Sequence, residues 1–192
     1  MAALASGIGG RVVALADGMA ADDAPRIAVT FDDGYRDNLR VAAPVLQQHQ
    51  IPFTVFVCTG FMRDHLGNFL APADVRELAS MPGAAIGSHG ATHTPLTALD
   101  DRALHDELIT SKSELENITG QAVNAISYPH GAVDRRVREA AAAAGYTIGA
   151  CSRFDINSPG RDPLLLCRTD IHAGDSLRIF RQKLRGDWDW YK

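Results

Sequence analysis

The sequence lacks several features that would indicate a particular class of protein. Its 192 residues carry a net charge of −4, so there is no excess of basic residues of the kind that nucleic-acid binding needs. No uninterrupted apolar run reaches the length that crosses a membrane. Hydrophobic residues make up 46% of the chain and charged residues 22%, the ordinary balance of a globular domain with a sizeable core. We therefore expect neither a nucleic-acid-binding protein nor a membrane-spanning one.

Cysteine is also scarce, which excludes a disulfide-rich protein. Cys58, Cys151 and Cys167 stand far apart in apolar runs, and no pair has the spacing of a metal or redox motif. We expect three reduced thiols in the core. Residues 1–25 lack the apolar core of a signal peptide and are interpreted as an N-terminal extension. This predicts a cytoplasmic protein, or a secreted or periplasmic one if the natural chain begins earlier.

The remaining residues, 26–192, are predicted to form a single domain in which strands and helices alternate. Strands are expected at 26–31, 53–57, 84–87, 123–128, 146–150 and 164–167. Helices are expected at 39–49, 73–80, from a capping box at 97–100 to 119, at 135–144 and from 176 to about 186, with a loop around Gly60 and Gly67. This alternation is typical of parallel strands with helical crossovers, either in an open doubly wound sheet or in a barrel.

Two adjacent carboxylates, Asp32 and Asp33, follow the first strand and precede Gly34. Neighbouring carboxylates repel each other unless a cation lies between them or one of them stays protonated. Asp-Gly is also a common pair in tight turns, so an ordinary turn is the alternative interpretation.

Two histidines four residues apart, His89 and His93, follow the third strand at the same predicted sheet edge as Asp33. Two imidazoles and one carboxylate are an ordinary ligand set for a catalytic zinc-type ion with positions left open for water. Two solvated loop histidines are the alternative. The shared edge with Asp33 favours a metal site, because active sites gather at the carboxyl ends of parallel strands.

Three motifs succeed one another along the chain: Thr30-Phe31-Asp32-Asp33-Gly34, then Ser88-His89 with His93, then Tyr128-Pro129-His130-Gly131. Their order resembles that of the polysaccharide deacetylase family, the NodB-homology group of carbohydrate esterase family 4. The resemblance extends from about residue 27 to 186. It implies an α/β fold, a distorted (β/α)₇ barrel, and removal of acetyl groups from N-acetylated sugars. It also implies one divalent metal ion, with zinc expected first and cobalt, nickel, manganese or iron as alternatives.

The resemblance further implies a role for each motif residue. Asp33, His89 and His93 correspond to the metal ligands, and Asp32 corresponds to the base that accepts a proton from metal-bound water. A backbone N–H near His130 or Gly131 would hold the oxyanion. The residues expected at the substrate and the oxyanion are Tyr35, Tyr128, Pro129, His130 and Gly131.

Three positions depart from the family pattern. Ser127 stands where the family often has an arginine that tethers the base, and we expect Arg168 to replace it, with a surface salt bridge as the alternative. His130 replaces the aromatic residue of the family loop, either as part of the groove wall or as a proton donor. The acid for the leaving nitrogen is expected at His172, a few residues late, with His130 or a water as alternatives.

The sequence therefore predicts a metal-dependent hydrolase that removes N-acetyl groups from amino sugars in a polysaccharide, oligosaccharide or glycolipid intermediate. The first alternative is a hydrolase of another C–N amide, of the allantoinase or cyclic imidase type, because the altered Tyr-Pro-His-Gly loop leaves room for it. The second is a carbohydrate-binding relative without catalysis. The expected partner is an N-acetylated sugar, and the sequence predicts no oligomeric state.

Overall fold

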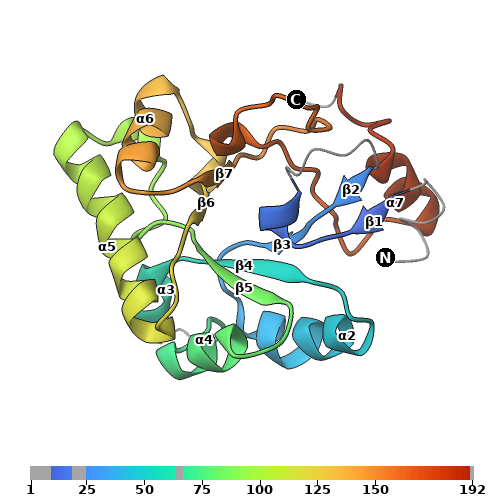
Figure 1. Ribbon diagram of the computed structural model, residues 1–192, viewed down its shortest axis with the longest axis horizontal. Coiled ribbons are helices and arrows are strands. Elements are labelled where there is room, and N and C mark those ends of the chain that lie inside the picture. Colours follow the sequence, from blue (N-terminus) through green and yellow to red (C-terminus); the bar gives the residue numbers. More distant parts are fainter. Residues whose placement is uncertain (1–9, 19–24, 64–66, 191–192) are drawn as a thin grey trace.

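A curled parallel sheet lies at the centre of the computed structural model, which describes residues 10–18, 25–63 and 67–190 (Figure 1). Five strands pair in the order β3-β4-β5-β6-β7, and every pairing is parallel. Their bounds are β3 Val29–Phe31, β4 Phe53–Val57, β5 Ala84–Ser88, β6 Ala125–Ser127 and β7 Ile148–Ala150. A separate parallel pair is formed by β1 (Arg11–Val12) and β2 (Arg26–Ile27). Most of the predicted N-terminal extension lies outside the described residues.

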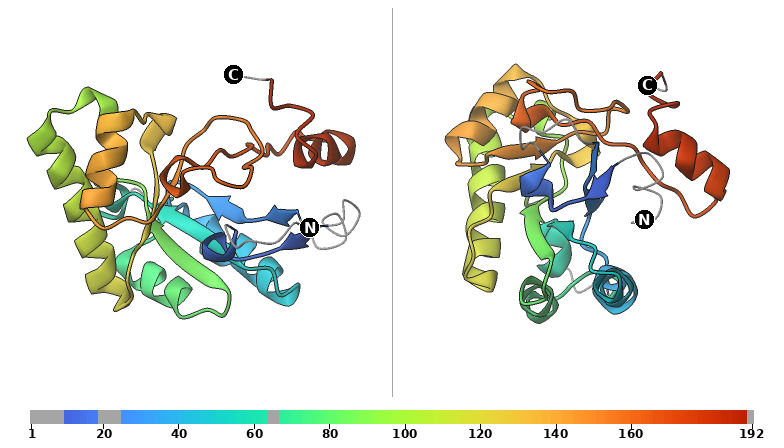
Figure 2. Two further views of the ribbon diagram at one scale, coloured as in Figure 1. Left: turned by 45° about the horizontal axis from the view of Figure 1, so that its top comes forward. Right: turned by 45° about the vertical axis from the view of Figure 1, so that its right-hand side comes forward.

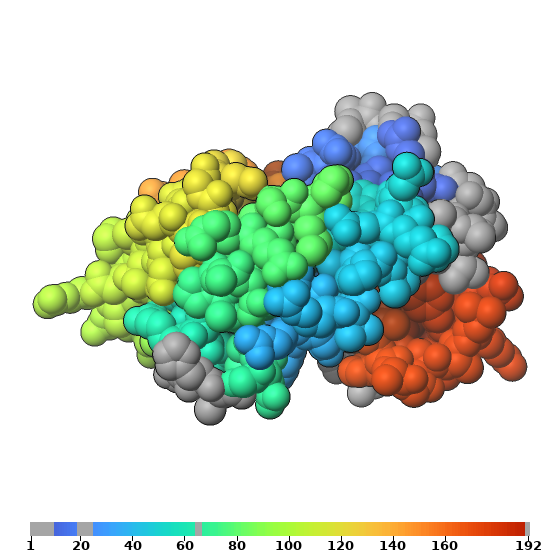
Figure 3. Space-filling view, turned by 90° about the horizontal axis from the view of Figure 1, so that it is seen from below, coloured from blue at the N-terminus to red at the C-terminus, as the bar shows by residue number. Residues whose placement is uncertain are grey.

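Helices surround the curled sheet. Their bounds are α2 Ala43–Gln48, α3 Thr59–Arg63, α4 Pro72–Ala79, α5 Asp101–Thr119, α6 Arg135–Ala143 and α7 Leu177–Leu184. Short 3-10 turns lie at Leu15–Asp17, Leu96–Ala98, Pro129–Gly131 and Pro163–Leu165. The helices α2 and α4 form one outer face (Figure 3), whereas α7 lies away from α5 and α6 (Figure 2). Among the described residues, no helix combines the length and apolarity needed to span a bilayer.

The core lies between the sheet and its helices. All five residues of β4 are buried, as expected for a central strand covered on both faces. Helix α5 contributes Leu104, Leu108 and Leu115, each almost fully buried, at helical spacing. Burial of one such side chain contributes about 2 kcal/mol to folding, so this face of α5 holds the helix firmly against the sheet.

The first expected strand, 26–31, is divided in two. β2 pairs with β1, whereas β3 pairs with β4, and the chain changes partner at Ala28. The helix expected at 39–49 begins as a π-helical turn over Asn38–Ala42. Pro44 explains this widening, because proline has no N–H to donate and its ring crowds the carbonyl four residues earlier.

Two helical segments also differ from expectation at their starts. Asp100, not Thr97, caps α5, because its side chain accepts the N–H of Ala103 at 2.8 Å. The expected loop around Gly60 contains the short helix α3, and the N–H of Gly60 donates to the carbonyl of Ala91 at 2.7 Å. A Cβ at Gly60 would collide with that carbonyl, so this glycine allows a close approach of two backbones.

The prediction of a strand at 164–167 was wrong. Residues Pro163–Leu165 form a 3-10 turn, because the Asp162 side chain accepts the N–H of Leu164 at 2.9 Å and directs the chain away from a ladder. Only Leu166 makes a parallel bridge, to Ala150. The predicted caps Asp134 of α6 and Ser176 of α7 are confirmed by their side-chain hydrogen bonds. The three cysteines are free and buried, as predicted.

Candidate metal centre and active site

Asp33, His89 and His93 meet at the carboxyl edge of the sheet. The Nε2 atoms of His89 and His93 lie 3.3 Å and 3.2 Å from the same carboxylate oxygen of Asp33. One ligand atom from each residue lies within 4.8 Å of the others, and no second group of His, Cys, Asp or Glu in the described part of the chain has this geometry. Nitrogen and carboxylate donors at this separation fit a divalent transition-metal ion.

Two of these three residues have an unusual backbone. Asp33 has a φ of 69° and His93 a φ of 61°, both in the left-handed region. This conformation costs a non-glycine residue roughly 1–2 kcal/mol. Such strain gathers at functional sites, where the surrounding structure enforces it. The fold therefore holds the two side chains in directions that relaxed loops would not favour.

Glu107 holds the loop between the two histidines. This α5 residue is only 6% exposed, and its carboxylate accepts the N–H of Ala91, the N–H of Thr92 and the hydroxyl of Thr92. Charge-assisted hydrogen bonds of this kind are stronger than neutral ones. The role of Glu107 was not predicted from the sequence, although the signal was present. A glutamate within the apolar face formed by Leu104, Leu108 and Leu115 needs donors for its carboxylate.

The end of β6 fixes the orientation of His89. The Nδ1–H of His89 donates to the carbonyl oxygen of Ser127 at 2.7 Å. Because a carbonyl oxygen can only accept, Nδ1 carries the hydrogen of this bond, and in the neutral ring it is Nε2 whose lone pair faces Asp33. An imidazole held through its far nitrogen is the usual arrangement of a metal ligand.

Asp32 points to Arg168 instead of joining the cluster. Two hydrogen bonds of 2.7 Å join the Arg168 guanidinium to the two carboxylate oxygens. The Ser127 hydroxyl accepts from Arg168 at 2.8 Å and donates to Asp32 at 3.1 Å. Burial acts to raise the pKa of Asp32, but the hydrogen bonds and charge of Arg168 outweigh it, so this pKa lies below its ordinary value. Asp32 is therefore ionised at neutral pH.

The pKa shifts of Asp33 and His93 suit metal binding. Interaction with His89, and then with His93, lowers the pKa of Asp33 when those rings are protonated, and it outweighs the opposing effect of burial. Burial, together with the charge of His89, lowers the pKa of His93. An ionised carboxylate and neutral imidazoles are the forms that coordinate metals.

The Tyr128–Gly131 loop contributes backbone and one exposed ring. His130 has a φ of 58°, and its Nε2 lies 3.2 Å from the carbonyl oxygen of His93. The N–H of Gly131 donates to the carbonyl of Tyr128 within the turn at 2.8 Å. The expectation that the Tyr128 side chain contacts the substrate was wrong. Its ring is buried, and its hydroxyl donates to the carbonyl of Leu164 at 2.9 Å. Pro129 is also buried.

The structure places His172 on an exposed segment that leads to α7. Its backbone N–H donates to the carboxylate of Asp175 at 2.9 Å, and this carboxylate pairs with Lys183 at 2.7 Å. None of the contacts described for His172 reaches the Asp33 cluster. Tyr35 lies exposed two residues after Asp33, with its ring stacked on that of Phe69.

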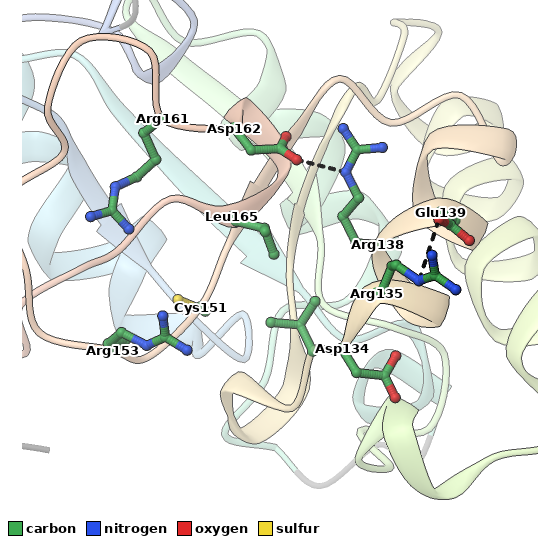
Figure 4. Close-up of a pocket in the computed structure, with 10 residues that line it drawn as sticks. Asp134, Arg135, Arg138, Glu139, Cys151, Arg153, Arg161, Asp162 and Leu165 are labelled. Carbon is green, nitrogen blue, oxygen red and sulfur yellow. Dashed lines mark hydrogen bonds and ion pairs between the residues drawn. The ribbon is translucent and has the colours of Figure 1, made fainter.

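A separate cavity of about 510 Å³ opens beside α6 (Figure 4). Four arginines line it, with Arg138 paired to Asp162 at 2.7 Å and Arg135 close to Glu139 at 3.9 Å. Figure 4 shows Cys151 and Leu165 between the arginines. None of the Asp33 cluster lines this cavity, so it is distinct from the candidate metal centre.

Comparisons with known proteins identify the family that this chain matches. The profile of the polysaccharide deacetylase family matches residues 20–149. The putative polysaccharide deacetylase YxkH of Bacillus subtilis (strain 168) is 31% identical over 154 residues, which are 80% of this chain and 54% of that protein. The chitooligosaccharide deacetylase of Rhizobium leguminosarum bv. trifolii is 36% identical over 90 residues, 46% of this chain and 39% of that protein. The chain thus spans about half, or less, of these curated relatives.

A solved structure of another protein has a similar fold. The Streptococcus pyogenes deacetylase PplD, determined in complex with acetate, superposes with a TM-score of 0.84 at 23% identity and covers 95% of this chain and 83% of its own. This similarity confirms the predicted distorted barrel, which here is an open half-barrel of parallel strands.

Proposed function

This chain belongs to the polysaccharide deacetylase family, and on that premise we propose that it removes N-acetyl groups from amino sugars by metal-dependent hydrolysis. The observation that carries the proposal is the meeting of Asp33, His89 and His93 beside the Asp32–Arg168 pair. We assign the reaction to residues 26–192 as a single catalytic domain. The substrate is an N-acetylated sugar within a polysaccharide, oligosaccharide or glycolipid.

One Asp33 oxygen and the Nε2 atoms of His89 and His93 would hold the ion. We propose zinc, although cobalt, nickel, manganese and iron accept the same donors. When bound, the ion lowers the pKa of water and polarises the acetamide carbonyl. The left-handed backbone at Asp33 and His93 and the Glu107 contacts keep the ligands in place before the ion arrives.

Asp32 accepts the proton of the attacking water. Its Oδ2 accepts from both Arg168 and the Ser127 hydroxyl, whereas its Oδ1 accepts from Arg168 and keeps a second lone pair for that proton. Because Arg168 and Ser127 fix the plane of the carboxylate, the proton acceptor is preorganised and needs no reorientation during the reaction.

The His130 loop is assigned to the carbonyl oxygen and the leaving nitrogen of the reacting amide. The N–H of Gly131 is engaged inside the turn, so we assign the oxyanion to the backbone N–H of His130. The exposed His130 ring contacts His93, whereas the described contacts of His172 lie with Asp175. This placement favours His130 over His172 as the group that meets the leaving nitrogen.

The test is acetate release from chitooligosaccharides by the zinc-loaded protein. We expect turnover that stops when a chelator removes the metal and returns when zinc is added back. Ring opening of allantoin without acetate release would replace this proposal with an amidase of another substrate. Binding of glycans without turnover of any amide or ester would replace it with a non-catalytic function.

A further inference from the structure

Two of the free thiols, those of Cys151 and Cys167, belong to neighbouring positions of adjoining backbone segments. Ala150 and Leu166, the residues just before them, form a parallel bridge. The N–H of Leu166 donates to the carbonyl of Gly149 at 2.8 Å, and the N–H of Cys151 donates to the carbonyl of Leu166 at 2.8 Å. Residues one step beyond a parallel bridge are again opposite each other, with their side chains on the same side. The two thiols are therefore neighbours, and they interact directly.

The surroundings of the pair give one of the thiols a route to small molecules. Cys151 lines the cavity of about 510 Å³ beside α6, between the arginines (Figure 4), whereas Cys167 is not among its lining residues. The Sγ of Cys167 accepts from Arg161 at 3.0 Å. Burial, with Cys151 alongside, raises the pKa of Cys167 to about 11 although Arg161 opposes the rise, so this thiol is protonated at neutral pH. A small oxidant that enters the cavity meets Cys151 first.

The pair is directly joined to the residue that positions the proposed base. Arg168 follows Cys167 in the chain, and its Nε–H donates to the carbonyl of Cys151 at 3.2 Å. Its remaining guanidinium nitrogens hold the two oxygens of Asp32. The backbone N–H of Arg168 donates to the carbonyl of Arg153 at 3.0 Å. Movement of either cysteine is therefore passed to Arg168, through the chain or through the Cys151 carbonyl.

A disulfide between the two thiols would draw the two segments together. Neighbouring strands lie about 4.8 Å apart, whereas the Cβ atoms of a disulfide lie only about 3.8 Å apart. The backbones at 151 and 167 must therefore approach each other by about 1 Å, and Arg168 moves with them. A displacement of this size can cost a positioned catalytic group about 100-fold in rate.

We propose that Cys151 and Cys167 form a reversible disulfide that displaces Arg168 from Asp32 and so lowers hydrolytic activity under oxidising conditions. Hydrogen peroxide is the oxidant. Its O–O bond breaks as one oxygen is transferred to the sulfur of Cys151, which becomes a sulfenic acid, and the first water leaves. The Cys167 thiol then attacks that sulfur, the S–S bond forms, and the hydroxyl leaves with the Cys167 proton as a second water. The effect on activity rests on the proposed function, whereas formation of the disulfide does not.

Thiol titration of the unfolded protein after treatment with hydrogen peroxide counts the pair directly. We expect two of the three thiols to be lost together and dithiothreitol to restore both. Peptide mapping without reductant should then join the peptide of Cys151 to that of Cys167. Three thiols that persist, the loss of one thiol alone, or a link that involves Cys58 would each overturn the pair.

Acetate release by the same zinc-loaded samples measures the effect on Arg168. We expect oxidation to lower kcat about 10- to 100-fold and dithiothreitol to restore it. Cys151→Ala and Cys167→Ala should each keep their untreated activity in peroxide, whereas Cys58→Ala, the matched control, should remain sensitive.

A disulfide that forms without any change in kcat would overturn the link between the pair and Arg168. If the reduced protein releases no acetate from any sugar, the proposed hydrolysis is wrong. The thiol count and the linked peptides still decide in that case whether the disulfide forms.

Discussion

The Arg168 guanidinium meets the Asp32 carboxylate through two parallel hydrogen bonds of 2.7 Å, across 136 residues of sequence. Bidentate pairing of this kind needs the planar fork of arginine, which lysine cannot reproduce. The side chain also lies over the ring of Phe56, with the guanidinium carbon 5.7 Å from the ring centroid. Arg168 thus makes with Asp32 the contact that the resemblance implies for an arginine at the position of Ser127.

Arg168→Lys should reduce kcat about 10- to 100-fold, since the carboxylate loses its fixed plane. The pKa of Asp32 should rise, because burial then acts with a weaker opposing charge. As the base works only when deprotonated, the acid limb of the kcat/KM profile should move to higher pH. Arg138→Lys, which alters the Arg138–Asp162 pair, is the matched control and should leave the profile in place. An acid limb that does not move in Arg168→Lys would contradict the tether.

Loss of a candidate ligand should separate metal binding from base catalysis. We expect His89→Ala to weaken zinc affinity by more than about 100-fold, because the ligand atom itself is removed. Asp32→Asn should retain zinc and lose turnover, since the amide cannot accept the proton. Competition with a chromogenic chelator measures both affinities. Wild-type zinc affinity in His89→Ala would rule out this ligand set.

Glu107→Gln should weaken zinc affinity about 10- to 100-fold, the usual effect of disturbing a group that orients ligands. The glutamine amide has a single acceptor oxygen, so its NH2 group would face one of the donors that Ala91 and Thr92 present, and the His89–His93 loop would shift. Glu114→Gln on the same helix is the control, because Glu114 pairs only distantly with Arg63, at 3.7 Å. If the two variants bind zinc equally well, the loop is held by something other than Glu107.

Asp74 should make part of the stability depend on pH. Burial acts to raise its pKa, but the N–H of Ala71 and the charges of Arg36 and Arg40 outweigh it, so its pKa is lower in the folded chain than in the unfolded one. Its contribution is complete above the unfolded pKa and is lost as the pH falls through the folded pKa. Asp74→Asn should cost about 2 kcal/mol at pH 7 and less below about pH 4.

Urea unfolding at several pH values measures this difference. Glu77→Gln is the control, because Glu77 is exposed at the surface, and its pair with Arg40 should contribute less than about 1 kcal/mol. A difference between wild type and Asp74→Asn that stays constant from pH 7 to pH 3 would show that the carboxylate charge is not the cause.

The sequence predicted the alternation of strands and helices because hydrophobic period and caps are local signals. β4, α4 and the caps Asp134 and Ser176 agree with those signals. The strand expected at 164–167 does not, since the N–H of Leu164 donates to the Asp162 side chain, and this bond competes with sheet pairing there. Local sequence patterns do not predict whether the backbone N–H groups of a short segment bond to a neighbouring strand or to a nearby side chain.

In the site, too, some features were predictable from the sequence and others depend on tertiary contacts. Asp33, His89 and His93 lie together because each follows a parallel strand, and strand ends share one edge of the sheet. The direction of the Tyr128 ring was not predictable, because it depends on where the Leu164 carbonyl passes behind it. The place of Glu107 within an apolar helix face was visible in the sequence, but its partners, the N–H groups of Ala91 and Thr92, come from a segment whose approach only the tertiary structure defines.

Ser127 joins the two halves of the site with different atoms. Its carbonyl oxygen accepts from His89, and its hydroxyl contacts both Asp32 and Arg168. The orientation of the imidazole and that of the carboxylate therefore both depend on the position of one residue at the end of β6. A substitution that moved this strand end would disturb the metal ligand and the proton acceptor in a single step.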